Sequence, residues 1–118
     1  MSRLKSMITA ATLGAALLGT SSTAFAADKL VILLDWFVNP DHAPLIVAKE
    51  KGFFANHDLE VELIEPSDPS APPRLVAAGQ GDVAVNYQPQ LHVQAAQGLP
   101  LTRIGTLVAT PLNSLIVL

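Results

Sequence analysis

Apolar and polar positions change period along the chain, and these changes predict a series of strands and helices. Residues 29–35 form an almost continuous apolar run, which is typical of a strand buried on both faces of a parallel sheet. Residues 59–64 alternate apolar and acidic positions, which indicates a strand buried on one face. We expect strands at 29–35, 59–64, 82–87, 102–108 and 114–118.

Prolines and glycines indicate helices between these strands. Pro44 suits a first helical turn, and Gly52 suits the position just after a helix. The two phenylalanines at 53–54 should fill the core beneath that helix. The stretch 65–73 is rich in proline and indicates a stiff loop, with Ser70 as the N-cap of the next helix. We expect helices at 44–51, 74–78 and 89–97, each followed by a glycine.

Strands that alternate with helices through short connections predict an α/β fold, with a parallel sheet and helices on both of its faces. In such sheets, ligands bind outside the carboxyl ends of the strands. The first and third predicted strands both end in polar and aromatic side chains, so these side chains should meet at one edge. The candidate ligand-binding residues are Asp35, Trp36, Asn39, His42, Tyr87 and Gln88.

Trp36 and Tyr87 dominate the chemistry of this edge. Two aromatic faces can stack on a planar ring, which adds roughly 0.5–1.5 kcal/mol beyond burial, and Asp35 offers a hydrogen-bonding carboxylate. The combination suits a flat, polar, nitrogen-rich small molecule. The alternative is a scaffold role, in which Trp36 caps the core and Asp35 caps a turn. The residues alone leave these two interpretations level.

Residues 1–26 have the pattern of a secretory signal peptide. Two basic residues precede an uncharged apolar run at 8–19, and the small-x-small sequence Ala24-Phe25-Ala26 follows. The run is shorter than the roughly 20 residues that a membrane span needs, and it lacks the polar face of an amphipathic helix. We expect cleavage before Ala27 and a periplasmic location.

Charge and cysteine content exclude several classes of function. Removal of residues 1–26 takes away Arg3 and Lys5, and it leaves five basic against ten acidic residues, a net charge of −5 with histidines neutral. No basic patch is available for nucleic acid. The absence of cysteine excludes disulfides and cysteine-based metal or nucleophile chemistry in these residues. No other apolar stretch is long enough to cross a bilayer, so we expect a protein that does not itself span the membrane.

No catalytic or metal-binding pattern stands out. His42, His57 and His92 are far apart and match no zinc spacing, and the serines have no triad-type neighbours in the sequence. His57 and His92 should lie at the surface, whereas His42 can either touch a ligand or cap the helix that follows it. The glutamates at 60, 62 and 65 should face water. We therefore expect no catalytic residues, no metal and no cofactor.

The last residues, 112–118, stop inside an apolar, strand-like run without a turn or a polar tail. A domain rarely ends by exposing unpaired backbone and apolar side chains. We expect residues 27–118 to form an α/β unit that is truncated at its C-terminus.

Several segments resemble a known superfamily. The DWFxNPDH and YQPQ motifs, with the flanking segments 35–54, 65–70, 75–79 and 82–90, are similar to the pyrimidine-type members of the superfamily that groups ABC-importer substrate-binding proteins with fungal thiamine pyrimidine synthases. The most similar branch is the bacterial one, which binds a formylaminopyrimidine precursor of thiamine. The resemblance covers residues 28–118.

This resemblance implies a periplasmic-binding-protein type II fold, in which two α/β lobes close over a ligand. Residues 27–118 would then supply most of the N-terminal α/β lobe of a substrate-binding domain, truncated at its C-terminus. It also implies that Trp36, Asn39 and Tyr87 line a pyrimidine pocket, with Asp35 and His42 beside them. The binding protein of such an importer delivers its ligand to the membrane permease, which would be the protein partner.

The chain departs from the enzymes of the superfamily at two positions. The fungal enzyme uses a lysine that holds pyridoxal phosphate and a histidine that is consumed as substrate. Asn86 stands where the lysine should be, and Gln90 stands where the histidine should be. An amide cannot replace the Schiff-base amine, and His92 is two positions away.

We therefore expect the substrate-binding component of an ABC importer that takes up a pyrimidine precursor of thiamine. One alternative is a suicidal thiamine pyrimidine synthase that uses pyridoxal phosphate. A second is a related binder for a sulfonate, nitrate or riboflavin-like ligand. Small anions fit poorly, because they would need an arginine or a helix N-terminus rather than aromatic and acidic side chains.

Overall fold

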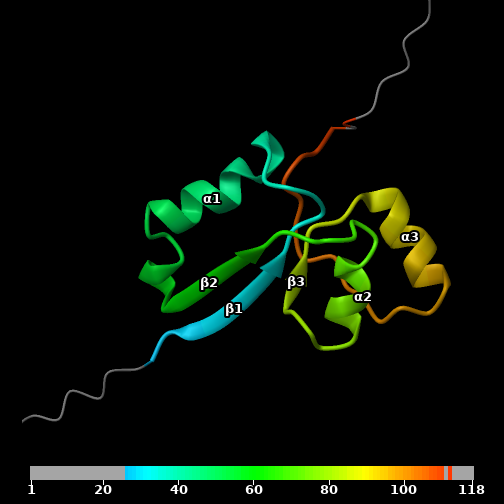
Figure 1. The fold of residues 1–118 in the computed structure, drawn as a ribbon, viewed down its shortest axis with the longest axis horizontal. Helices are drawn as coiled ribbons and strands as arrows, with labels where there is room; N and C mark the ends of the chain where they lie inside the picture. Colours follow the sequence, from blue (N-terminus) through cyan, green and yellow to red (C-terminus); the bar gives the residue numbers. More distant parts are fainter. Residues whose placement is uncertain (1–25, 111, 113–118) are drawn as a thin grey trace, which may run out of the picture.

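The computed structural model describes residues 26–110 and residue 112 (Figure 1). The predicted signal peptide, apart from its last residue, and the predicted strand at 114–118 lie outside the described residues. The elements, in chain order, are β1 (Asp28–Leu33), η1 (Pro40–His42), α1 (Ala43–Glu50), η2 (Ala55–His57), β2 (Leu59–Ile64), α2 (Pro72–Ala77), β3 (Val83–Ala84) and α3 (Gln88–Ala96).

The strands form one parallel sheet with the order β2-β1-β3. β1 pairs with β2 along its whole length, whereas β3 pairs only with Ile32 and Leu33 of β1. The predicted strand at 82–87 is therefore shorter than expected, because β1 itself ends at Leu33 and offers no further partner. The predicted α/β class with a parallel sheet is confirmed, and the arrangement is consistent with part of a periplasmic-binding-protein fold.

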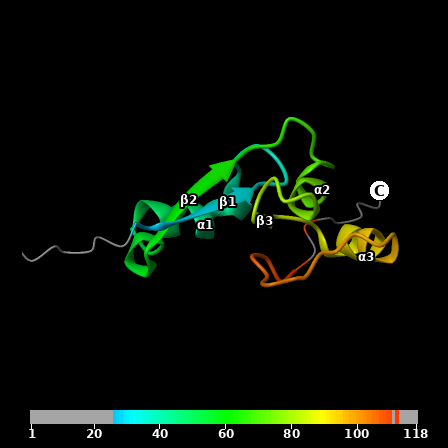
Figure 2. The ribbon, with the colours of Figure 1, turned by 90° about the horizontal axis from the view of Figure 1, so that it is seen from below.

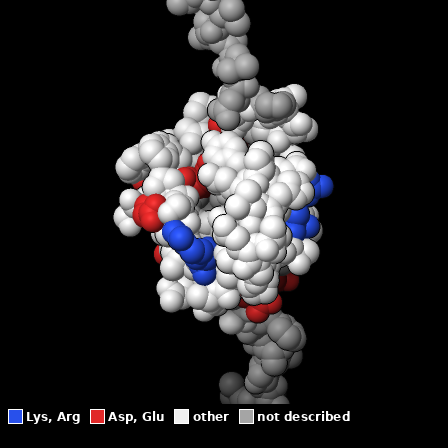
Figure 3. Space-filling view, turned by 90° about the vertical axis from the view of Figure 1, so that its right-hand side faces the viewer, with Lys and Arg blue, Asp and Glu red and all other residues white. Residues whose placement is uncertain are grey.

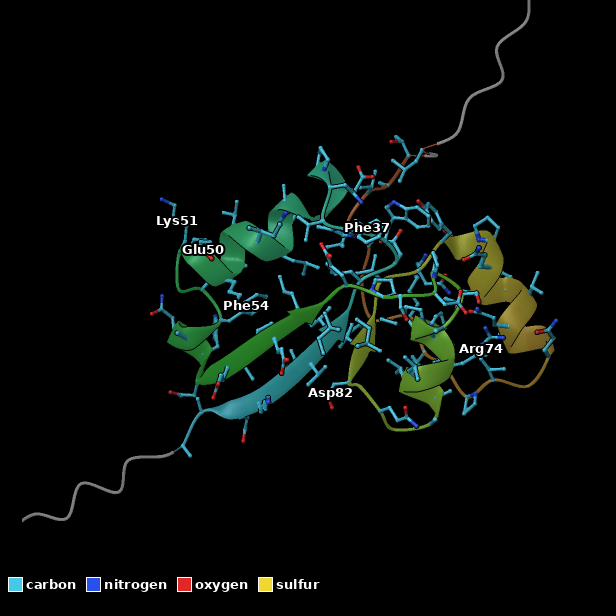
Figure 4. All side chains as sticks on the ribbon, in the orientation of Figure 1. Phe37, Glu50, Lys51, Phe54, Arg74 and Asp82 are labelled. Atoms are coloured by element: carbon cyan, nitrogen blue, oxygen red, sulfur yellow. The ribbon has the colours of Figure 1, made fainter. Side chains whose placement is uncertain are left out.

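The helices surround this small sheet (Figures 1 and 2). α1 lies along β1 and β2, whereas α2 and α3 lie on the β3 side. Phe54 lies between α1 and β2 (Figure 4), but its neighbour Phe53 is 56% exposed. The predicted core-filling role is therefore wrong for Phe53, and Phe54 is only half-buried.

The core sits on the central strand and its continuation. Ile32, Leu33 and Leu34 of this segment are buried together with Val61 of β2. Leu34 is completely inaccessible, and its N–H still donates to the carbonyl of Ile64 at 2.8 Å although β1 has ended. This places the residue after Leu34 at the rim of a rigid core.

The helix boundaries follow the predicted prolines and glycines. Gly52, Gly79 and Gly98 all have positive φ just after α1, α2 and α3, a conformation that glycine adopts without steric cost. The predicted N-cap at Ser70 is wrong, because α2 begins after Ala71 without a side-chain cap. The Ser70 hydroxyl instead donates to the Asp68 carboxylate at 2.8 Å.

The predicted strand at 102–108 is also wrong. The structure assigns no strand to these residues, and Ile104 is 78% exposed. An apolar run becomes a strand only when a neighbouring backbone can pair with it, and within the described residues this segment makes no such ladder. No helix of the described residues is long and apolar enough to cross a membrane.

Candidate functional site

The carboxyl ends of β1 and β3 meet at one edge of the sheet, as predicted. A cavity of about 200 Å³ opens there, lined by Asp35, Trp36, Pro69, Tyr87 and Gln90. Three of the six predicted ligand-binding residues, Asp35, Trp36 and Tyr87, therefore lie around one cavity, although they come from segments about 50 residues apart.

The two aromatic side chains leave much of their surface free. Trp36 is 51% exposed and Tyr87 is 43% exposed. Trp36 packs edge-to-face against Phe37, with ring centroids 5.7 Å apart and planes at 82°, and Phe37 belongs to the loop that joins β1 to η1 (labelled in Figure 4). The exposed part of the two rings is available for stacking on a ligand.

A buried histidine holds the carboxylate of the site. His42 is only 1% exposed, and its Nε2 lies 2.7 Å from Oδ1 of Asp35. His42 also ends the short helix η1, so a single side chain joins this helix to the end of β1. The side chain of His42 does not cap α1, the helix that follows it, but its Nδ1 accepts from the N–H of Asn39 at the start of η1. Its contact with a ligand stays a prediction.

Asn39 fixes the loop that carries the aromatic side chains. Its Oδ1 accepts from the N–H of Asp41 at 2.9 Å, and its Nδ2 donates to the carbonyl of Phe37 at 3.0 Å. The N–H of Val38 donates to Glu65 at 2.7 Å, which ties the same loop to the end of β2. Asn39 does not line the cavity described here, and its role as a ligand contact stays a prediction.

The surroundings of Tyr87 shift the pKa of its phenol. Burial raises the pKa of Tyr87, and the nearby Asp35 carboxylate raises it further. The more distant charge of Asp41 acts in the same direction. The phenol therefore stays protonated, and it can donate a hydrogen bond at neutral pH.

The polar residues on either side of Tyr87 form hydrogen bonds with partners outside the cavity. Nδ2 of Asn86 donates to Oε1 of Gln94 in α3 at 2.8 Å. Gln88 lies within 3.4 Å of His92, and Oε1 of Gln88 accepts from Arg103 at 3.5 Å. Gln88 does not line the cavity in the structure, so its predicted contact with a ligand stays a prediction.

Two lining residues, Pro69 and Gln90, were missed from the sequence. Pro69 belongs to the proline-rich loop, which was interpreted only as a connection, and its stiffness was the one available signal. Gln90 was noticed only because it replaces a histidine. It also borders a second, wider cavity of about 370 Å³, lined by Ser70, Pro89, Gln90, Val93, Gln94 and Gln97.

The surface beside α3 is poor in charge. The helix carries no Lys, Arg, Asp or Glu, and acidic and basic side chains lie around a broad uncharged area when the molecule is viewed from this side (Figure 3). Arg74 of α2 donates to the Ser70 hydroxyl at 2.7 Å rather than lining a cavity. Within the described part of the chain, no group of three or more His, Cys, Asp or Glu could hold a metal ion.

Comparison with known proteins identifies a matching family. The family described as NMT1/THI5 like matches residues 39–118. This range includes the loop that carries Asn39 and His42, all of β2 and β3, and the Tyr87 end of the cavity.

Individual relatives cover the whole cavity. Over 94 residues, 80% of this chain, it is 61% identical to a Haemophilus influenzae protein named for thiamine biosynthesis. It is 37% identical over 77% of its length to a 4-amino-5-hydroxymethyl-2-methylpyrimidine phosphate synthase of Uromyces fabae. It is 35% identical over 80% of its length to a formylaminopyrimidine-binding protein of Halalkalibacterium halodurans. The chain spans only 27–30% of the length of these relatives.

Proposed function

This chain belongs to the NMT1/THI5-like family, and from that premise we propose that it is part of an exported protein that binds a pyrimidine precursor of thiamine for an ABC importer. The single observation that carries the proposal is the cavity at the carboxyl ends of β1 and β3, which is lined by Asp35 and by two half-exposed aromatic rings. The rings offer stacking faces to a flat heterocycle, and the carboxylate accepts from an amino substituent.

The chemistry of the cavity supports binding better than the synthase reaction. Among the described residues that line the two cavities there is no lysine, so no amine is available there to form a Schiff base with pyridoxal phosphate. At the position expected for that lysine, Asn86 is hydrogen-bonded to Gln94 in α3. These residues do not fit the cofactor, although synthases occur among the relatives.

Small anions are a weaker alternative. The smaller cavity is lined by a carboxylate and by no cationic side chain, so a sulfonate or nitrate would meet repulsion from Asp35. A riboflavin-like ligand shares the flat ring, and its size is the main difference from a pyrimidine. A titration that compares the affinities for these ligands therefore tests the proposal.

We expect the full-length protein to bind a formylaminopyrimidine or 4-amino-5-hydroxymethyl-2-methylpyrimidine at least tenfold more tightly than riboflavin, nitrate or an alkyl sulfonate. Isothermal titration calorimetry with each compound measures this preference. The reason is that only the aminopyrimidines combine a small ring for the aromatic faces with an amine for Asp35. Heat from riboflavin or an anion, with none from either pyrimidine, would contradict the proposal.

The same protein should form no aldimine with pyridoxal phosphate. Absorbance spectroscopy with the cofactor, followed by borohydride treatment and peptide mapping, provides this arm of the test. A reducible aldimine band that maps to a lysine of the protein would favour the synthase and remove the binding assignment.

Export and delivery complete the proposal. A protein of this kind would act in the periplasm and pass its ligand to a membrane permease, and residues 1–26 carry the basic start, apolar run and cleavage sequence that export requires. We expect the mature protein to begin at Ala27 or within one or two residues of it. Mass spectrometry of the protein from a periplasmic extract measures the N-terminus, and an intact Met1 on cytoplasmic protein would contradict export.

A further inference from the structure

His42 is the most deeply buried polar side chain near the cavity, and the contacts of its two ring nitrogens define its tautomer. The N–H of Asn39 donates to Nδ1 of His42 at 3.3 Å, so Nδ1 must be an unprotonated acceptor. The proton of the neutral ring is therefore on Nε2, which lies 2.7 Å from Oδ1 of Asp35 and donates to it. The ring is thus held at both nitrogens, and only one tautomer satisfies both contacts.

This arrangement fixes the direction of the carboxylate. The side chain of Asp35 is 15% exposed, and it follows Leu34, which is completely buried. A carboxylate has about four acceptor sites, so the bond from His42 leaves capacity toward the cavity that Asp35 lines.

We propose that His42 is a positioning residue that aims the Asp35 carboxylate at the amino group of the ligand, so that the protein selects aminopyrimidines over analogues without the amine. This inference rests on the proposed function, because it assigns the contact that recognises the ligand within the same cavity. His42 itself does not line the cavity and acts through Asp35. A hydrogen bond made to a fixed carboxylate costs less ordering than one made to a freely rotating side chain.

Two substitutions separate this role from the structural role of His42. In His42→Asn, the side-chain oxygen can take the place of Nδ1 and accept from Asn39, but no donor reaches Asp35. In His42→Gln, the amide nitrogen can take the place of Nε2 and donate to Asp35, while the cap on Asn39 is lost. His42→Asn therefore keeps the contact with Asn39 and loses the contact with Asp35. His42→Gln keeps the contact with Asp35 and loses the contact with Asn39.

The experiment compares two ligands in the full-length protein by calorimetry. One is 4-amino-5-hydroxymethyl-2-methylpyrimidine, and the other is the same molecule without the amino group. We expect His42→Asn to bind the aminopyrimidine about tenfold more weakly than the wild type, as for a lost hydrogen bond to a charged group. Its affinity for the analogue should be unchanged. His42→Gln should retain most of the wild-type preference for the amine, even where its unfolding temperature falls.

The outcomes distinguish failure of the proposed function from failure of the role assigned to His42. A wild-type protein that binds neither pyrimidine overturns the proposed function and this inference with it. Wild-type binding with the same preference for the amine in His42→Asn overturns the inference alone. If His42→Asn does not fold, Asp35→Asn provides the second test, because it removes the charged acceptor without changing the size of the side chain. Full preference for the amine in Asp35→Asn also overturns the inference.

Discussion

Trp36→Ala should weaken binding of the aminopyrimidine by on the order of 1–3 kcal/mol, which is roughly 5- to 150-fold in Kd. The indole lines the cavity and is 51% exposed in the empty protein, so its free surface becomes buried when a ligand stacks on it. The free energy of unfolding should fall by less than the about 3–5 kcal/mol that an aromatic-to-alanine change costs in a core. Calorimetric titration and denaturant unfolding of the full-length protein measure the two quantities.

Phe37→Ala is the matched control for this change. Phe37 is 61% exposed and packs against Trp36 with the ring planes at 82°, but it does not line the cavity. Its removal takes away a similar aromatic area from the same loop and should change affinity much less than Trp36→Ala does. Unchanged affinity together with a large loss of stability in Trp36→Ala would assign Trp36 to the scaffold. As the only tryptophan of the chain, Trp36 also offers a fluorescence readout of ligand, once tryptophans elsewhere in the protein are replaced.

Leu34→Ala should have the opposite signature, a loss of about 2–5 kcal/mol of stability with little change in affinity per folded molecule. Leu34 is completely buried, so its truncation leaves a cavity in a small core that cannot easily collapse. It precedes Asp35 but does not line the ligand cavity. Urea unfolding measures the stability, and titration at a temperature where the variant is folded measures the affinity.

Val47→Ala is the control for Leu34→Ala. Val47 lies on α1 and is 49% exposed, so the substitution should change the free energy of unfolding by no more than about 0.5 kcal/mol. If Leu34→Ala lost affinity for the ligand at nearly unchanged stability, the assignment of Leu34 to the core rather than to the binding site would be contradicted. The residues 34–36 would then act as one unit in ligand binding.

The parts of the fold that the sequence predicted are those in which local pattern and tertiary packing agree. β2 was predicted with its observed bounds, because its alternation matches a strand with one buried face. The three helix-ending glycines were predicted because the backbone conformation after each helix favours glycine over any other residue. The meeting of Trp36 and Tyr87 followed from parallel topology alone, which places the carboxyl ends of strands at one edge.

The missed features depend on partners that are distant in the sequence. The apolar run at 102–108 has strand-like composition, but composition does not supply the neighbouring backbone that a strand needs. The length of β3 depends on where β1 ends. The hydrogen bond between His42 and Asp35 joins the start of an irregular loop to the end of η1, and no regular period relates positions across such a segment. The lining role of Gln90 requires the packing of α3 beside the loop at Pro69.

The acidic pattern on β2 has a consequence for how the sheet forms. β2 lies at one edge of the described sheet, and unpaired edge backbone can recruit a strand from a second copy of the chain. Parallel strands assemble slowly, because each pairing must first close a long crossover loop. Glu60 and Glu62 lie exposed on this edge strand, with Lys29 of β1 only 3.1 Å from Glu62. Two copies that met along β2 would bring rows of like charge together, so this strand resists aggregation while the rest of the sheet is still incomplete.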